Sequence, residues 1–195
     1  MVKFLPKTVK FLVDTKKDNM PDFNNQPNHV IIDNHGKPHW ISRSLAVVVT
    51  IILNNEKVLL VKRGPKVSSP GKWCNPCGYL DWDESATQCA LREVWEETGL
   101  DLTELISTDK VKINLLNYPW DIVTNPTLNG NQDIALYFGV TIETDEDPII
   151  TKEYCEEGET EDVKWVNIKS LHGYDFAFNH DKRIDKFLKH IENGN

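Results

Sequence analysis

The segment of residues 85–99 constrains this chain most, because both ends of one helix are marked in it. Ser85 and Gln88 have capping-box spacing, so the serine hydroxyl can accept from the Gln88 N–H while the glutamine side chain reaches back. Gly99 suits the position after the last turn, since glycine adopts the left-handed conformation without strain. The sequence therefore predicts a helix over about Ala86–Thr98.

The predicted helix has two unlike faces when its residues are placed at about 100° intervals. One side, which we expect to pack against the rest of the domain, carries Leu91, Val94, Trp95 and Thr98. The opposite side carries three glutamates beside small residues, namely Glu93, Glu96, Glu97, Ala86, Cys89 and Ala90. Like charges on neighbouring turns repel one another. This side is therefore either a solvated acidic surface or a site for a divalent cation, whose oxygen ligands suit Mg²⁺, with Mn²⁺ as the alternative.

Strand patterns flank this helix on both sides. Leu45–Leu53 is a β-branched apolar stretch, and Asn54-Asn55 signals a turn into a second strand over residues 58–61. Further strands are expected over residues 111–116, 134–142 and 163–166. The chain ends in a helical pattern, with apolar residues at Ile184, Phe187, Leu188 and Ile191. These elements predict an α+β or mixed α/β fold.

The first 40 residues differ from the remainder. Asparagine, proline and aspartate crowd between residues 18 and 28, which is typical of a linker. Short apolar runs on either side of Asn34-His35-Gly36 predict a hairpin. We therefore expect an N-terminal extension over residues 1–40 and one domain over residues 41–195.

The charge of −8 is concentrated in one segment. Residues 143–162 hold ten acidic residues and one lysine, which disfavours nucleic-acid binding through a basic face and is compatible with a cation. No run approaches the roughly 18 apolar residues of a membrane span. The start of the chain lacks the apolar core of a signal peptide, and four cysteines are too few for a disulfide framework. A cytoplasmic protein without membrane contact is expected.

The predicted helix belongs to a longer pattern. Residues 78–100 follow the spacing G-x5-E-x7-R-E-U-x-E-E-x-G-U, where U is aliphatic, at Gly78, Glu84, Arg92, Glu93, Val94, Glu96, Glu97, Gly99 and Leu100. This pattern resembles the Nudix box of the Nudix hydrolase superfamily at every constrained position. Similar lead-in and late strands extend the resemblance to about residues 43–192. It implies the Nudix fold, an α/β/α sandwich with a mixed central β-sheet.

The resemblance also implies a reaction and a metal. Nudix hydrolases cleave the pyrophosphate linkage of a nucleoside diphosphate derivative by Mg²⁺-assisted attack of water on phosphorus. Carried onto this chain, Glu93, Glu96, Glu97 and the Gly78 carbonyl would hold the cation. Arg92 would orient Glu93 through an ion pair.

The general base differs among members of the family and stays open here. Glu93 is one candidate, and a glutamate of the acidic segment is the other, with Glu157, Glu159 and Glu161 the most plausible. A merely solvated loop is the plainer interpretation of that segment.

Substrate contacts are expected from both sides of the box. Arg63 and Lys72 lie near it in sequence and would hold phosphate, although a solvated surface is an equal alternative for Lys72. Tyr118 resembles the tyrosine of dinucleoside polyphosphate hydrolases and could stack on a base. No substrate follows from these residues beyond a nucleotide.

The chain departs from the family at Cys77, which replaces a glycine and forms C-x-x-C with Cys74. We expect buried thiols there instead of a redox or zinc site. Two alternatives to hydrolysis remain: a Nudix-fold module that senses a nucleotide without cutting it, and an isoprenoid diphosphate isomerase. The extension could also complete a homodimer, as in some family members.

Overall fold

The computed structural model describes residues 29–41, 43–107, 112–115, 117–125 and 133–194. The chain divides into two compact units, residues 1–43 and 44–195. In the first unit, β1 (His29–Ile32) and β2 (Pro38–Ile41) pair antiparallel and form the hairpin that the sequence predicts. Asp33 stabilises its turn, because the carboxylate accepts from the His35 and Lys37 N–H groups at 2.9 Å each.

The second unit forms a mixed α/β structure. Its described elements are β3 (Leu45–Leu53), β4 (Lys57–Arg63), β5 (Trp73–Cys74), β6 (Cys77–Tyr79), α1 (Ala86–Thr98), α2 (Leu102–Ile106), β7 (Lys112–Leu115), β8 (Asp121–Val123), β9 (Ile134–Glu143), β10 (Thr160–Asn167), the 3₁₀ helix η2 (Ile168–Gly173) and α3 (His180–Glu192). The strands that the sequence predicts correspond to β3, β4, β7, β9 and β10. The short elements α2, β8 and η2 are not predicted.

All described strands of the second unit join one mixed sheet, as expected. The order along its main path is β10-β4-β3-β9-β7, while β5, β6 and β8 attach to β4, β3 and β9. β3 and β9 run parallel, and the other neighbours on this path run antiparallel. The turn between β3 and β4 uses Asn54 and Asn55 in the left-handed conformation, with φ of 52° and 54°. Asparagine tolerates that conformation better than most residues.

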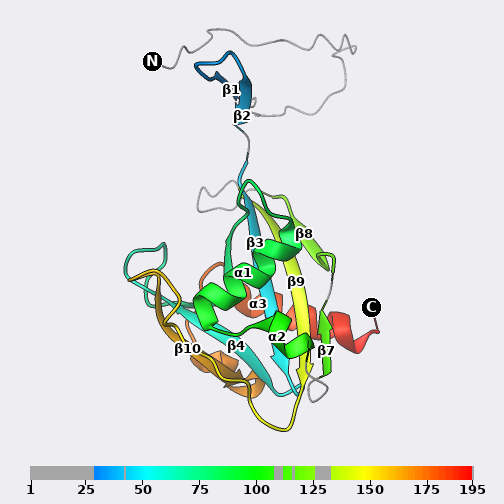
Figure 1. The fold of residues 1–195 in the computed structure, drawn as a ribbon. Coiled ribbons are helices and arrows are strands. Elements are labelled where there is room, and N and C mark those ends of the chain that lie inside the picture. The colour runs from blue at the N-terminus through cyan, green and yellow to red at the C-terminus, as the bar shows by residue number, and fades with distance from the viewer. Residues whose placement is uncertain (1–28, 42, 108–111, 116, 126–132, 195) are drawn as a thin grey trace, which may run out of the picture. The chain divides into compact units, whose positions relative to one another are not determined.

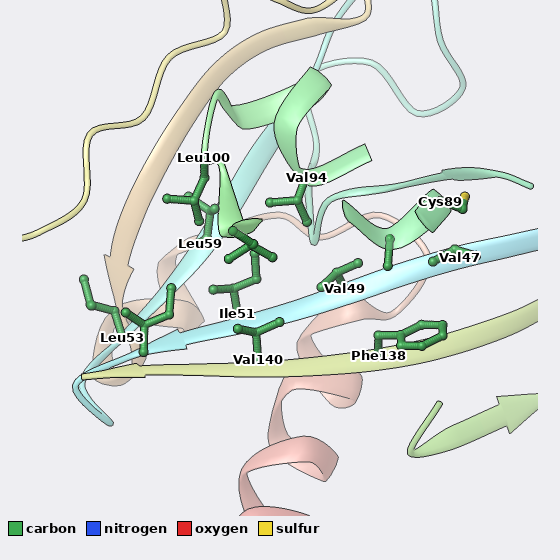
Figure 2. Packing of buried hydrophobic residues seen from close by; sticks show 13 residues of the cluster. Val47, Val49, Ile51, Leu53, Leu59, Cys89, Val94, Leu100, Phe138 and Val140 are labelled. Atoms are coloured by element: carbon green, nitrogen blue, oxygen red, sulfur yellow. The ribbon is translucent and has the colours of Figure 1, made fainter. Parts of the chain in front are cut away.

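Helices cover both faces of the sheet (Figure 1). Alternate residues of β3 point to opposite faces, because side chains alternate along a strand. The face under α1 holds a buried cluster that includes Val47, Val49, Ile51, Leu53, Val94 and Phe138 (Figure 2). The other face packs Ile52 against Ile184 and Phe187 of α3. The expected α/β/α sandwich is confirmed.

Helix α1 has the bounds that its sequence predicts, and both caps are formed. Ser85 and Gln88 make the reciprocal capping-box bonds, and Gly99 ends the helix with φ of 68°. The predicted packing face is wrong at Trp95, which is 41% exposed. The buried side of the helix is shifted toward the glutamates, so Cys89, Ala90 and Glu93 are buried with Val94.

No helix in the described part of the chain combines the length and the apolar composition that crossing a membrane requires.

Candidate active site

Strand β6 runs beneath the glutamates of α1 and brings two backbone groups against them. β6 is held in the sheet by pairing with β3, where Gly78 lies opposite Val47. A Cβ atom at Gly78 would lie 2.0 Å from Oε1 of Glu93, so only glycine leaves room for this carboxylate. The N–H of Cys77 donates to Oε2 of Glu97 at 2.8 Å. Side chains and backbone from residues 77–97 therefore meet at one point.

Arg92 connects three glutamates on the near side of this point. Its Nη1 donates to Glu93 at 2.7 Å and to Glu96 at 2.9 Å. Its Nη2 and Nε donate to both oxygens of Glu84, at 2.7 and 3.0 Å. Glu84 also accepts from the Asp81 N–H at 2.9 Å, which ties the loop after β6 to the helix. The expected ion pair between Arg92 and Glu93 is present.

Ion pairing and burial shift the pKa values of these glutamates in opposite directions. The hydrogen bond from Arg92 lowers the pKa of Glu84 to about 2, and Glu84 in turn raises the pKa of Arg92. Burial raises the pKa of Glu93 despite the neighbouring guanidinium. Burial also raises the pKa of Glu97 well above its ordinary value. Neighbouring positive charges and hydrogen bonds therefore do not fully offset the cost of burying the Glu93 and Glu97 carboxylates.

A cavity of about 560 Å³ opens over these residues. Among the described residues, two guanidinium groups line it, those of Arg63 and Arg92. Six carboxylates line it as well: Asp81, Glu93, Glu96, Glu97, Glu156 and Glu159. The excess of negative charge disfavours an anionic ligand on its own and favours a cation.

The donor set fits a hard divalent cation such as Mg²⁺ or Mn²⁺. Carboxylate oxygens are the ligands these ions prefer, and a cation would stabilise the charged forms that burial disfavours at Glu93 and Glu97. In the part of the chain that the structure describes, no three His, Cys, Asp or Glu side chains already converge as ligands of one ion. Glu93 and Glu96 instead share Nη1 of Arg92.

The acidic segment contributes one of the three glutamates that the sequence favours and one that it does not. Glu159 lines the cavity, as does Glu156. Glu157 is almost fully exposed, with Lys66 at 4.0 Å. Glu161 pairs with Lys62 at 2.6 Å. Glu159 lies just before β10, whereas Glu161 lies within it, where the pairing with β4 shifts register between Thr160 and Asp162.

The substrate contacts expected from the sequence are also separated by the fold. Arg63 ends β4 and lines the cavity, where its side chain donates to the Ser68 carbonyl at 2.5 Å and lies 4.8 Å from the Phe178 ring centre. Lys72 pairs with Asp175 at 3.2 Å and does not line the cavity. Tyr118 is 82% exposed and also lies outside the lining.

A second cavity of about 580 Å³ adjoins the first, since Arg63, Cys77, Gly78 and Tyr79 line both. Its remaining lining includes aromatic and basic residues that sequence reasoning missed: Tyr137, Phe178, His180 and Arg183. Three of these, Phe178, His180 and Arg183, come from the start of α3 and the loop before it, 78 to 83 residues after Leu100 at the end of the box. No local signal marks them, because only the folded domain brings that segment close to β6.

His180 is the most deeply buried group of the second cavity. It is 2% exposed, and its Nδ1 accepts from the Asn75 N–H at 3.0 Å. Burial, with Arg63 and Arg183 nearby, lowers the pKa of His180 to about 3. The imidazole is therefore neutral, with its proton on Nε2.

The cysteines of the C-x-x-C pair are free thiols. Cys74 is buried, as expected, while Cys77 is only partly buried and lines both cavities. Hydrogen bonding with Cys74 and burial raise the pKa of Cys77 well above its ordinary value, which disfavours the reactive thiolate.

Sequence comparison finds relatives that share part of this chain. The m7GpppN-mRNA hydrolase NUDT17 of Danio rerio is 37% identical over 91 residues, which cover 45% of this chain and 29% of that protein. The mRNA decapping complex subunit 2 of Schizosaccharomyces pombe is 30% identical over 125 residues, or 63% of this chain and 14% of that protein. The chain thus spans less than a third of either relative.

Structure comparison finds the same fold in distant proteins. The NUDIX domain of Shewanella oneidensis NrtR, solved with ADP ribose, has a TM-score of 0.58 and 21% identity, covering 77% of this chain and 89% of that chain. A bifunctional NMN adenylyltransferase/ADP ribose pyrophosphatase from Francisella tularensis, solved with AMP and a Mn ion, has a TM-score of 0.57 and 23% identity, covering 76% and 42%. The NUDIX domain family model matches residues 43–191. With its box, its cavity and its sandwich in agreement, the chain belongs to the NUDIX domain family.

Proposed function

We propose that this chain hydrolyses the pyrophosphate linkage of a nucleoside diphosphate derivative, with Mg²⁺ as cofactor and Mn²⁺ as the alternative. One observation supports this most: the box carboxylates share one cavity with the glycine that makes room for them. The names of the two curated relatives, which describe a hydrolase and a decapping subunit, agree with it. The free thiols of all four cysteines also fit a reducing compartment such as the cytoplasm.

Glu93, Glu96, Glu97 and the Gly78 carbonyl would hold the cation. When bound, the cation neutralises phosphoryl oxygens and makes a water molecule more acidic. Arg92 keeps Glu93 and Glu96 in position through its two bonds of 2.7 and 2.9 Å.

Glu159 is the base that we propose for the attacking water, with Glu93 as the alternative. Both carboxylates line the cavity, which is the first requirement for a group that takes a proton from water. Glu159 has the advantage that Arg92 does not occupy it. Arg63 would hold a phosphoryl oxygen by its fixed positive charge.

The second cavity would receive the remainder of the substrate. Because the two cavities share Arg63 and Gly78, a diphosphate in the first can extend directly into the second. Tyr137 and Phe178 offer aromatic faces there for a base or another ring. The negative net charge makes a small nucleotide a better first candidate than a long nucleic acid.

A phosphate-release screen tests the proposal. Purified protein with Mg²⁺ is given ADP-ribose, NADH, dinucleoside polyphosphates, nucleotide sugars, nucleoside triphosphates, 5′-triphosphorylated RNA and a capped RNA. We expect at least one compound that the wild type cleaves. Glu97→Gln should cleave the same compound at least about 100-fold more slowly. The matched control is Glu56→Gln, which makes the same change at an exposed residue of the β3–β4 turn.

The cation is tested separately. A chelator should abolish turnover, and added Mg²⁺ or Mn²⁺ should restore it. Binding of Mn²⁺, followed by its electron paramagnetic resonance signal, should weaken at least about tenfold in Glu97→Gln. Tight binding of a nucleotide without turnover of any compound would instead support the nucleotide-sensing module.

A further inference from the structure

Trp95 is a large apolar residue of the box that lies outside the buried hydrophobic clusters. It occupies the variable position between Val94 and Glu96, and it is 41% exposed. Its ring stacks on Tyr154, with the ring centres 4.7 Å apart and the planes 13° from parallel. Tyr154 is itself 53% exposed. Two large aromatic side chains at the surface thus cover each other instead of joining the core.

The partner of Trp95 belongs to the acidic segment that closes one side of the cavity. Within this segment Thr151 is attached to α1, because its N–H donates to the Thr98 carbonyl at 2.7 Å. Tyr154 lies three residues later and lines the cavity with Glu159. The stack is therefore a second attachment of the segment to α1, about one turn before Thr98.

Residues 158 and 159 of the segment are held by the chain after β4. The Gly64 N–H donates to the Glu159 carbonyl at 2.6 Å, and the Lys66 N–H donates to the Gly158 carbonyl at 2.9 Å. Residues 152–159 therefore span the cavity from α1 to this chain. Residues 152–154, at the α1 end of this span, are exposed. The stack of Tyr154 on Trp95 is the aromatic contact that joins them to α1.

We propose that Trp95, through its stack on Tyr154, is a positioning residue that holds residues 152–159 and thereby the Glu159 carboxylate at the cavity. The inference rests on the proposed function of that cavity. Helix α1, which carries the box glutamates, would then also set the position of Glu159. The proposed metal ligands and the proposed base would therefore be held by the same helix.

Two measurements test this in the full chain. Amide hydrogen exchange of residues 152–159 reports the attachment directly and requires no substrate. Trp95→Ala and Tyr154→Ala should each raise exchange in this segment about threefold to tenfold, as expected for loss of an aromatic stack. Trp95→Phe keeps a stacking ring and should restore protection. Ile149→Ala, which truncates an exposed apolar residue just before the segment, is the matched control.

The second measurement is the turnover of a substrate found in the screen. Trp95→Ala should lower kcat about tenfold with little change in KM, because it displaces a proton acceptor and leaves the binding residues in place. The effect should disappear in a Glu159→Gln background, and Tyr154→Ala should add nothing to Trp95→Ala.

The outcomes separate the two proposals. Unchanged exchange in Trp95→Ala would overturn the attachment whether or not the protein is an enzyme. Faster exchange with unchanged kcat, or an equal loss of kcat in the Glu159→Gln background, would overturn the positioning role. Absence of any turnover in wild type would count against the proposed function and against Trp95 as its positioning residue, while the exchange result would still decide the attachment.

Discussion

The buried imidazole of His180 makes the stability of this domain depend on pH in a direction that can be worked out. Burial lowers its pKa from 6.5 to about 3, and Arg63 and Arg183 act in the same direction. Between these two values the unfolded chain binds a proton that the folded chain does not. The free energy of unfolding therefore falls as the pH drops below 6.5.

The size of the effect follows from the same two values. One pKa unit corresponds to about 1.4 kcal/mol, so the full shift amounts to about 5 kcal/mol below pH 3. At pH 5 the imidazole of the unfolded chain is almost fully protonated, and the loss relative to pH 7.5 is about 2 kcal/mol. Such a loss is a large fraction of the stability of an ordinary domain.

Urea unfolding at pH 7.5 and pH 5 measures this loss, with His180→Gln as the comparison. Glutamine can accept the bond from the Asn75 N–H but does not titrate. Other groups, including Glu84 and Glu93, change stability over the same range. Their contributions cancel when the pH dependence of the variant is subtracted from that of wild type. A remaining difference below about 0.5 kcal/mol would refute the reasoning, as would an imidazole NMR signal that titrates above pH 5.

Three further outcomes are expected. Gly78→Ala should lower kcat/KM by about 100-fold and weaken Mn²⁺ binding, because the new Cβ would displace the Glu93 carboxylate; normal kinetics would contradict this. Gly99→Ala should reduce the free energy of unfolding by about 1–2 kcal/mol, measured by urea denaturation, since φ is 68° there; an unchanged midpoint would count against it. The homodimer predicted from residues 1–40 should be lost on sedimentation of residues 41–195, and an unchanged dimer would rule it out.

The parts of the structure that were predictable are those with local causes. Both ends of α1 follow from Ser85, Gln88 and Gly99, whose hydrogen bonds lie within a few residues of each other. The buried strands β3 and β9 follow from long apolar runs. The short elements α2 and β8 have too few residues to show a hydrophobic periodicity, so the sequence pattern does not predict them.

The predictions that depended on distant neighbours were less complete. Trp95 was predicted to pack in the core because a helical wheel gives the side of the helix on which a residue lies. It does not show whether the protein or solvent covers that side. Lys72 is paired with Asp175, a residue 103 positions later that no local pattern connects to it. Glu159 was one of three equally plausible glutamates of the acidic segment, and only the lining of the folded cavity separates it from Glu157 and Glu161.

The parallel pairing of β3 with β9 has a consequence for how the chain is made. The register joins Leu45 to Ile134 and Leu53 to Ile142, so each pair is separated by 89 residues. During synthesis β3 can pair with β4 and β6 early, but its edge toward β9 must stay uncovered until the box and the elements up to β9 have left the ribosome. A nascent chain that stops before residue 134 would expose this apolar strand edge, which favours aggregation. Ribosome pausing or truncation in that interval should make the protein depend on chaperones.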